Sequence, residues 1–130
     1  MHVPKTAGTS VCRALFDVKP RHAPLARFLA IDPDRFARYF KFGFVRNPWD
    51  RLFSAYSFLS RTPRRHFRPV VERQWVQRRL GATPTFEQFV LALDDRRRRE
   101  AFFSRKHFRP QRDWLRVPGH PDAGCDFIGR

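Results

Sequence analysis

The sequence predicts an α/β domain in which helices flank a small parallel sheet, and three observations lead to this prediction. The chain opens on the end of a strand, a tight turn with one glycine, and hydroxyl residues that begin a helix. A second strand, turn and helix follow over residues 42–56, and residues 126–130 form a last strand. The 130 residues, 42% apolar and 15% aromatic, suit one small globular domain over 1–130.

The opening loop, residues 1–10, predicts a phosphate site. Its turn aims several backbone N–H groups and the positive end of a helix dipole at one point. The Walker pattern GxxxxGK[ST] is absent, because the lysine of this loop precedes its glycine. An ordinary helix N-cap with a lysine beside it is the alternative. The predicted phosphate-binding residues are Lys5, Thr6, Ala7, Gly8, Thr9 and Ser10.

Residues 41–46 form the predicted second strand, and they place Arg46 at its carboxyl end, where open α/β sheets bind ligands. Asn47 is a good N-cap and Pro48 suits the first position of a helix over 48–59. Two further polar residues, Arg51 and Ser54, are three apart and share one face of that helix. An arginine at the strand end and a hydroxyl on the helix predict a second phosphate site. The apolar stripe of this helix, expected to be core, is Trp49, Leu52, Phe53 and Tyr56.

The helices around these two units are predicted from caps and apolar spacing. Residues 9–18 form a first helix, residues 22–27 a loop or short turn, and residues 35–40 a short helix after an acidic first turn. The residues of the first helix expected to face the core are Val11, Leu15 and Phe16.

The second half of the chain reads as helices joined by polar loops. Residues 70–80 form a helix with Gly81 at its C′ position, and residues 85–88 match a capping box that opens another helix. The basic loop at 62–69 is either a solvated surface or an edge that binds an acceptor. The charge run at 94–100 predicts an exposed helix face or a loop.

Residues 2–10 (HVPKTAGTS) and 44–56 (FVRNPWDRLFSAY) together resemble the carbohydrate sulfotransferase family, in the branch of heparan sulfate 2-O-sulfotransferases and bacterial relatives. Two later segments, 107–111 (HFRPQ) and 126–130 (DFIGR), are similar to the same family, so the resemblance spans nearly the whole chain. It implies a P-loop-like sulfotransferase core. It also implies a PAPS-dependent enzyme, which moves a sulfuryl group from 3′-phosphoadenosine 5′-phosphosulfate (PAPS) to a hydroxyl of a carbohydrate.

The resemblance also implies residue roles. Lys5 and the backbone of residues 6–10 would hold the 5′-phosphosulfate and stabilise charge on the bridging oxygen. Arg46 and Ser54 would bind the 3′-phosphate, with Arg51 as a supporting neighbour. His22 would take the proton of the acceptor hydroxyl, since an imidazole titrates in the right range. The second candidate base is His107, and a histidine that holds a loop is the alternative for it. No metal is required, because no carboxylate cluster is present to hold Mg²⁺.

The net charge of +15 predicts attraction to polyanions, although arginine supplies nearly all of it and genomic base composition explains such a bias equally well. Two alternatives to the sulfotransferase stay open. One is a P-loop-type phosphotransferase or NTPase, which the missing Walker lysine and acidic strand disfavour. The other is an inactive polyanion-binding fragment. The expected partner is a saccharide or other hydroxyl acceptor, with no specific nucleic acid.

The two cysteines, Cys12 and Cys125, lie far apart in sequence and have no zinc spacing. A free thiol is expected for Cys12, with a disulfide as the alternative, and with no visible signal peptide the pattern favours a cytoplasmic protein. Only three residues precede the phosphate loop, and the last strand stops at Arg130. We therefore expect a domain truncated at both ends. Membrane attachment through a segment outside this chain, the oligomeric state and the identity of the acceptor stay open.

Overall fold

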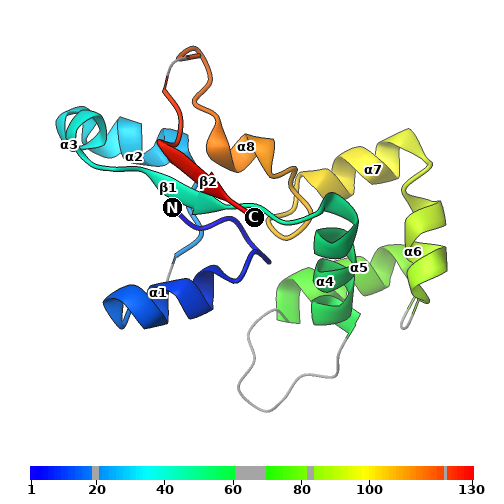
Figure 1. Ribbon diagram of the computed structural model, residues 1–130. Coiled ribbons are helices and arrows are strands. Elements are labelled where there is room, and N and C mark those ends of the chain that lie inside the picture. Colours follow the sequence, from blue (N-terminus) through cyan, green and yellow to red (C-terminus); the bar gives the residue numbers. More distant parts are fainter. Residues whose placement is uncertain (19–20, 61–69, 82–83, 122) are drawn as a thin grey trace. The chain divides into compact units, whose positions relative to one another are not determined.

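Two short parallel strands, β1 (Phe42–Phe44) and β2 (Phe127–Gly129), join segments of the chain that are far apart in sequence (Figure 1). Phe42 pairs with Phe127 and Phe44 with Gly129, and the N–H of Val45 continues the ladder to the carbonyl of Gly129 at 2.9 Å. The α/β class with a small parallel sheet flanked by helices is confirmed. The sheet was predicted over longer segments, because apolar runs do not mark where pairing stops.

The computed structural model describes residues 1–18, 21–60, 70–81, 84–121 and 123–130. The predicted basic loop at 62–69 lies outside these residues. The described helices are α1 (Gly8–Phe16), α2 (Leu25–Ile31), α3 (Pro33–Arg38), α4 (Pro48–Ser60), α5 (Val70–Leu80), α6 (Phe86–Ala92), α7 (Arg96–Phe103) and α8 (Arg112–Leu115). No described helix has both the length and the apolar character needed to cross a bilayer.

The chain divides into two compact units. The first unit, residues 1–47 and 110–130, holds the strand pair, in which Lys41 and Asp126 join the amino ends of β1 and β2. The Lys41 N–H donates to the Asp126 carboxylate at 2.5 Å, and the Asp126 N–H donates to the Lys41 carbonyl at 2.7 Å. The backbone hydrogen bond from Lys41 is the main cause that lowers the pKa of Asp126. In the same unit α2 packs against α3 and α8.

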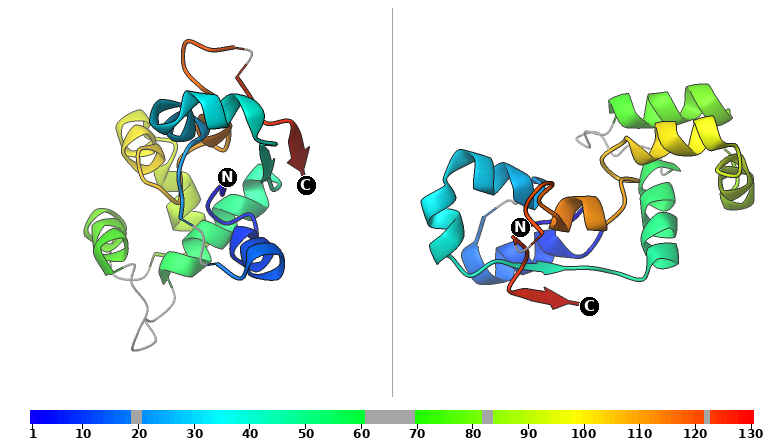
Figure 2. Two further views of the ribbon diagram at one scale, coloured as in Figure 1. Left: turned by 90° about the vertical axis from the view of Figure 1, so that its left-hand side faces the viewer. Right: turned by 90° about the horizontal axis from the view of Figure 1, so that it is seen from above.

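In the second unit, residues 48–109, the described residues form α4, α5, α6 and α7 (Figure 2). The core of this unit is mainly aromatic. Three buried phenylalanines form its centre, with ring centroids 5.3–5.4 Å apart: Phe89, Phe102 and Phe108. The predicted capping box is confirmed, because the Thr85 side chain accepts from the Gln88 N–H and the Gln88 side chain accepts from the Thr85 N–H. The helix end at Gly81 is confirmed too, with φ of 92° and its N–H on the carbonyl of Gln77.

Three element predictions are wrong. Residues 25–31, expected in part as a loop, form α2, which is anchored by the buried Leu25 next to α8. In α1, Leu15 and Phe16 were expected in the core, but they are 62% and 56% exposed. The predicted core stripe of α4 fails at Trp49 and Phe53, which are also exposed, because the face that α4 buries carries Arg51, Ala55 and Leu59. An apolar stripe is buried only where another element covers it.

Candidate active site

The opening loop has an unusual backbone. Lys5 and Ala7, on either side of Thr6, have φ of 69° and 59°. These values lie in the left-handed region, which residues other than glycine seldom adopt. Ala7 is the N-cap of α1, and the helix begins at Gly8. The Thr6 hydroxyl is buried and donates to the Val3 carbonyl at 2.9 Å, which holds the turn together from inside. A backbone that alternates between left-handed residues (Lys5 and Ala7) and a residue with negative φ (Thr6) turns successive N–H groups toward one concavity, as in anion-binding nests.

The N–H groups of this loop are available to a ligand. At the start of α1, the N–H groups of Ser10 and Val11 donate to the Ala7 carbonyl. Within the described part of the chain, the three preceding N–H groups, from Ala7 to Thr9, have no backbone acceptor. Unsatisfied N–H groups and the positive helix end together favour an anion. The Thr9 and Ser10 side chains are exposed and the Lys5 side chain is partly exposed, as the predicted site requires.

His22 lies beside this loop, and His2 is the residue between them. The His2 ring is 7% exposed and lies against Gly8, where any Cβ would collide with it. Its centroid is 4.3 Å from that of His22, and His22 Nδ1 is 3.4 Å from the His2 carbonyl oxygen. Burial lowers the pKa of His2 to about 4, and the nearby His22 and the amino terminus contribute. The edge of Trp114 approaches His22 at 6.3 Å between centroids. Sequence analysis missed His2, although it opens the family-like segment.

Arg46 belongs to the same unit and follows the carboxyl end of β1 with an exposed side chain. One side chain, Gln111, holds its backbone on both sides. Gln111 Oε1 accepts from the Arg46 N–H at 2.9 Å, and Gln111 Nε2 donates to the Arg46 carbonyl at 2.7 Å. The position of the Arg46 backbone therefore depends on Gln111, which sequence analysis placed in a family-like segment without giving it a role.

The other two residues of the predicted 3′-phosphate site, Arg51 and Ser54, belong to the second unit. Ser54 is partly exposed on α4. Arg51 is only 6% exposed, and its Nη2 donates to the carbonyls of His107 and Arg109 at 3.3 and 3.0 Å. Burial lowers the pKa of Arg51 to about 10. Arg51 thus supports the segment after α7, a role that no residue pattern in the sequence indicated.

His107 is held by a carboxylate within the second unit. Its Nδ1 lies 2.5 Å from Glu72 Oε2, its N–H donates to Glu72 Oε1 at 3.3 Å, and the Phe58 ring packs on it at 5.0 Å. Burial raises the pKa of Glu72, but the hydrogen bonds and charge of His107 outweigh burial and lower it overall. His107 is buried, and two bonds to one carboxylate are what a histidine that holds a loop would make.

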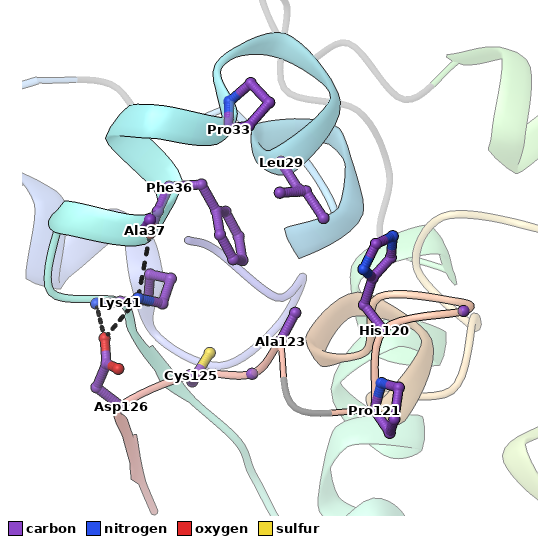
Figure 3. Close-up of a pocket in the computed structure, with 12 residues that line it drawn as sticks. Leu29, Pro33, Phe36, Ala37, Lys41, His120, Pro121, Ala123, Cys125 and Asp126 are labelled. Carbon is purple, nitrogen blue, oxygen red and sulfur yellow. Dashed lines mark hydrogen bonds and ion pairs between the residues drawn. The ribbon is translucent and has the colours of Figure 1, made fainter.

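A pocket of about 620 Å³ lies at the amino end of the strand pair, between α2, α3 and residues 119–121 and 123–126 (Figure 3). Lys41 and Asp126, whose Nζ and Oδ2 are 3.1 Å apart, line one side of it. None of the predicted site residues lines this pocket. In the described ranges, no group of three metal-binding side chains is present, and both Cys12 and Cys125 are free thiols.

A nest-like loop that opens a helix, beside a parallel strand pair, defines an α/β protein with a candidate anion site next to a histidine. The model of the sulfotransferase family matches residues 1–123, and the chain belongs to this family. It is therefore a transferase of the sulfuryl-transfer class. Searches among curated proteins and among solved structures returned no match.

Proposed function

We propose that this protein transfers a sulfuryl group from PAPS to a hydroxyl of a carbohydrate acceptor. Membership of the sulfotransferase family supports the reaction class. The observation that carries the choice of donor is the opening loop, with left-handed Lys5 and Ala7 and a run of unsatisfied N–H groups at the start of α1. When bound, PAPS supplies the activated sulfuryl group, which leaves from a phosphate oxygen.

The loop residues fit a phosphosulfate. The N–H groups from Ala7 to Thr9 would donate to its oxygens, because the left-handed residues already set their directions. Lys5 would neutralise negative charge that builds up on the bridging oxygen as the sulfuryl group departs. This use of fixed donors and charge follows the logic of phosphoryl transfer, in which the protein positions and stabilises more than it reacts.

His22 is the proposed base. It lies next to the loop through its contact with His2, and it is partly exposed, so an acceptor hydroxyl could approach it. His22 would accept the hydroxyl proton as the oxygen attacks sulfur. The buried, Glu72-bound His107 is a weaker candidate, since its bonds are those of a residue that stabilises a loop.

Arg46 is the proposed main ligand of the 3′-phosphate. Its exposed guanidinium can bind a phosphate through two parallel N–H groups, and Gln111 holds the backbone that carries it. Ser54 belongs to the other unit, and its contact with the 3′-phosphate stays a prediction. Arg51 stays a supporting residue in this proposal, because its Nη2 holds the carbonyls of His107 and Arg109.

Calorimetric titration with 3′,5′-ADP, the desulfated product, tests the donor assignment. We expect 3′,5′-ADP to bind more tightly than ATP, and Lys5→Ala and Arg46→Ala each to cost about 2–4 kcal/mol of binding or transition-state stabilisation. Lys106→Ala and Arg97→Ala are the matched controls, because both residues are exposed and lie outside the candidate site. Equal binding of ATP, or equal losses in the controls, would overturn the donor assignment.

The acceptor class needs an assay of its own. Transfer of labelled sulfate from PAPS to desulfated glycosaminoglycans should exceed transfer to a simple phenol or to a tyrosine peptide. His22→Ala should lower turnover by more than it lowers the affinity for 3′,5′-ADP. A preference for the phenol or the peptide would reassign the acceptor, and a pure affinity loss in His22→Ala would move the base elsewhere.

A further inference from the structure

We propose that His2 is a positioning residue for sulfuryl transfer: its ring fills the space between the phosphosulfate loop and His22, and its carbonyl selects the tautomer in which His22 can act as base. This inference rests on the proposed function. It adds a residue to which neither the family match nor the sequence motifs give a role.

The first contact ties His2 to the loop. The His2 ring occupies the position that a side chain on residue 8 would take, so Gly8 and the start of α1 lie directly against an imidazole. His2 is 7% exposed, and it precedes the buried residues Val3 and Pro4 that lead into the loop. A shift of the His2 ring would therefore move the first turn of α1, where the N–H groups for the phosphosulfate lie.

The second contact ties His2 to His22. The two rings are 4.3 Å apart between centroids, and the His2 carbonyl lies 3.4 Å from His22 Nδ1. A carbonyl only accepts hydrogen bonds, so this contact requires the proton of neutral His22 to be on Nδ1. Nε2 then carries the lone pair that a general base needs. A neutral histidine in water favours the opposite tautomer, with its proton on Nε2. The contact with the His2 carbonyl therefore favours the tautomer that is less common in water.

The third feature is the burial of the His2 ring, which disfavours protonation of His2 and leaves His22 to take the proton of the acceptor hydroxyl. Within the described residues, His2 Nδ1 is buried and has no hydrogen-bond partner. A protonated His2 would leave a charged N–H donor buried and unsatisfied, which is costly. His2 therefore stays neutral at physiological pH, in agreement with the lowering of its pKa to about 4 by burial. A proton taken from an acceptor resides on His22, next to an uncharged ring.

Two variants separate packing from acid–base chemistry. Both variants keep the backbone carbonyl of residue 2: His2→Phe also keeps a flat ring, whereas His2→Ala leaves the space beside Gly8 open. We expect kcat to fall at least tenfold in His2→Ala, with less than a threefold change in the Kd for 3′,5′-ADP, and to stay within threefold of the wild type in His2→Phe. His120→Ala, which removes an exposed histidine of the same unit, is the matched control and should change neither quantity.

Nitrogen-15 NMR of the histidine side chains reports the tautomer without any need for activity. We expect wild-type His22 to be protonated on Nδ1 when neutral. In His2→Ala the carbonyl of residue 2 is no longer held in place by a packed ring, so it should move away from Nδ1 and His22 should shift toward protonation on Nε2. A wild-type His22 protonated on Nε2 would overturn the inference. So would an unchanged kcat in His2→Ala, or a loss in His2→Phe as large as that in His2→Ala, since the nitrogens would then matter more than the shape.

The two proposals fail in different ways. If 3′,5′-ADP binds and Arg46→Ala weakens it, the proposed function stands even when the His2 variants leave kcat and the His22 tautomer unchanged, and only the role of His2 is lost. If 3′,5′-ADP binds no better than ATP, the proposed function fails. Circular dichroism of each variant distinguishes a local effect from loss of the fold.

Discussion

The side chain of Gln111 holds the backbone of Arg46 on both sides. Gln111 accepts from the Arg46 N–H and donates to the Arg46 carbonyl, at 2.9 and 2.7 Å. Gln111→Glu keeps the accepting oxygen and loses the donor, which leaves the Arg46 carbonyl facing a carboxylate. The loss of about one net hydrogen bond, worth roughly 1–1.5 kcal/mol, should raise the Kd for 3′,5′-ADP by about tenfold.

Calorimetry with 3′,5′-ADP measures this effect, and Gln74→Glu supplies the control. Gln74 is exposed on α5 in the other unit, so the same change in charge there should leave the Kd within twofold. Equal affinities of Gln111→Glu and wild type would show that Arg46 needs no such support.

His2 should make the stability of the protein depend on pH. Its pKa is about 4 in the folded state and near 6.5 when unfolded, so the unfolded chain binds the proton more readily. The free energy of unfolding therefore falls by roughly 3 kcal/mol as the pH drops from about 6.5 to 4, and this contribution of His2 is constant below pH 4.

Urea unfolding of the wild type and of His2→Phe at several pH values measures the contribution of His2 to the free energy of unfolding. Carboxylates that the fold stabilises, such as Glu72 and Asp126, lose their contributions at lower pH in both proteins. The difference between the two curves isolates His2. A difference that stays constant from pH 7 to pH 4 would mean that the folded state does not lower the pKa of His2.

Among the elements, α4 is joined to the segment after α7 by one buried arginine. Arg51 Nη2 donates to two backbone carbonyls, those of His107 and Arg109. In Arg51→Lys, a compact ammonium replaces the planar guanidinium and cannot keep both contacts in the same geometry. We expect the free energy of unfolding to fall by about 1–3 kcal/mol, the cost of a buried polar group left without its partner.

Urea denaturation measures this loss, with Arg97→Lys as its control. Arg97 is exposed on α7, and its replacement should change the stability by less than about 0.5 kcal/mol. If Arg51→Lys were as stable as Arg97→Lys, the two carbonyls would not depend on Arg51.

Local signals in the sequence predicted where several elements begin and end. Pro48 starts α4, Gly81 follows α5, and Thr85 with Gln88 caps α6, each as predicted. These features need only a few neighbouring residues, because a cap or a fixed φ acts within one turn of the chain. The same holds for the loop at Lys5 and Ala7, whose turn could be predicted from its residues although its left-handed backbone could not.

Burial and contacts between distant segments could not be predicted in this way. Leu15 of α1 and Trp49 of α4 are exposed, whereas Arg51 and His2 are buried. Periodicity shows which side chains share a face, but it does not show which face another element covers. The role of Gln111 depends on a contact with a residue 65 positions away in the sequence, which no local pattern contains.

Across the whole molecule, the net charge of +15 favours polyanions regardless of any specific site. Heparin chromatography and 3′,5′-ADP binding separate the two kinds of recognition. Binding to a polyanion depends on how many cationic side chains displace counterions from it. Arg46→Ala and Arg97→Ala should therefore lower the salt concentration needed for elution by similar amounts. Binding of 3′,5′-ADP depends on one guanidinium in one place, so only Arg46→Ala should weaken it.

Both arginines are exposed, but only Arg46 has its backbone held by the side chain of Gln111, just after the end of β1. Identical behaviour of the two variants in both assays would favour an inactive polyanion-binding fragment, in which any arginine serves as well as another. If only Arg46→Ala weakens binding of 3′,5′-ADP, and both variants elute from heparin at the same salt concentration, Arg46 belongs to a specific phosphate site. General attraction to polyanions would then act as steering toward acidic acceptors, and it should weaken as the ionic strength rises.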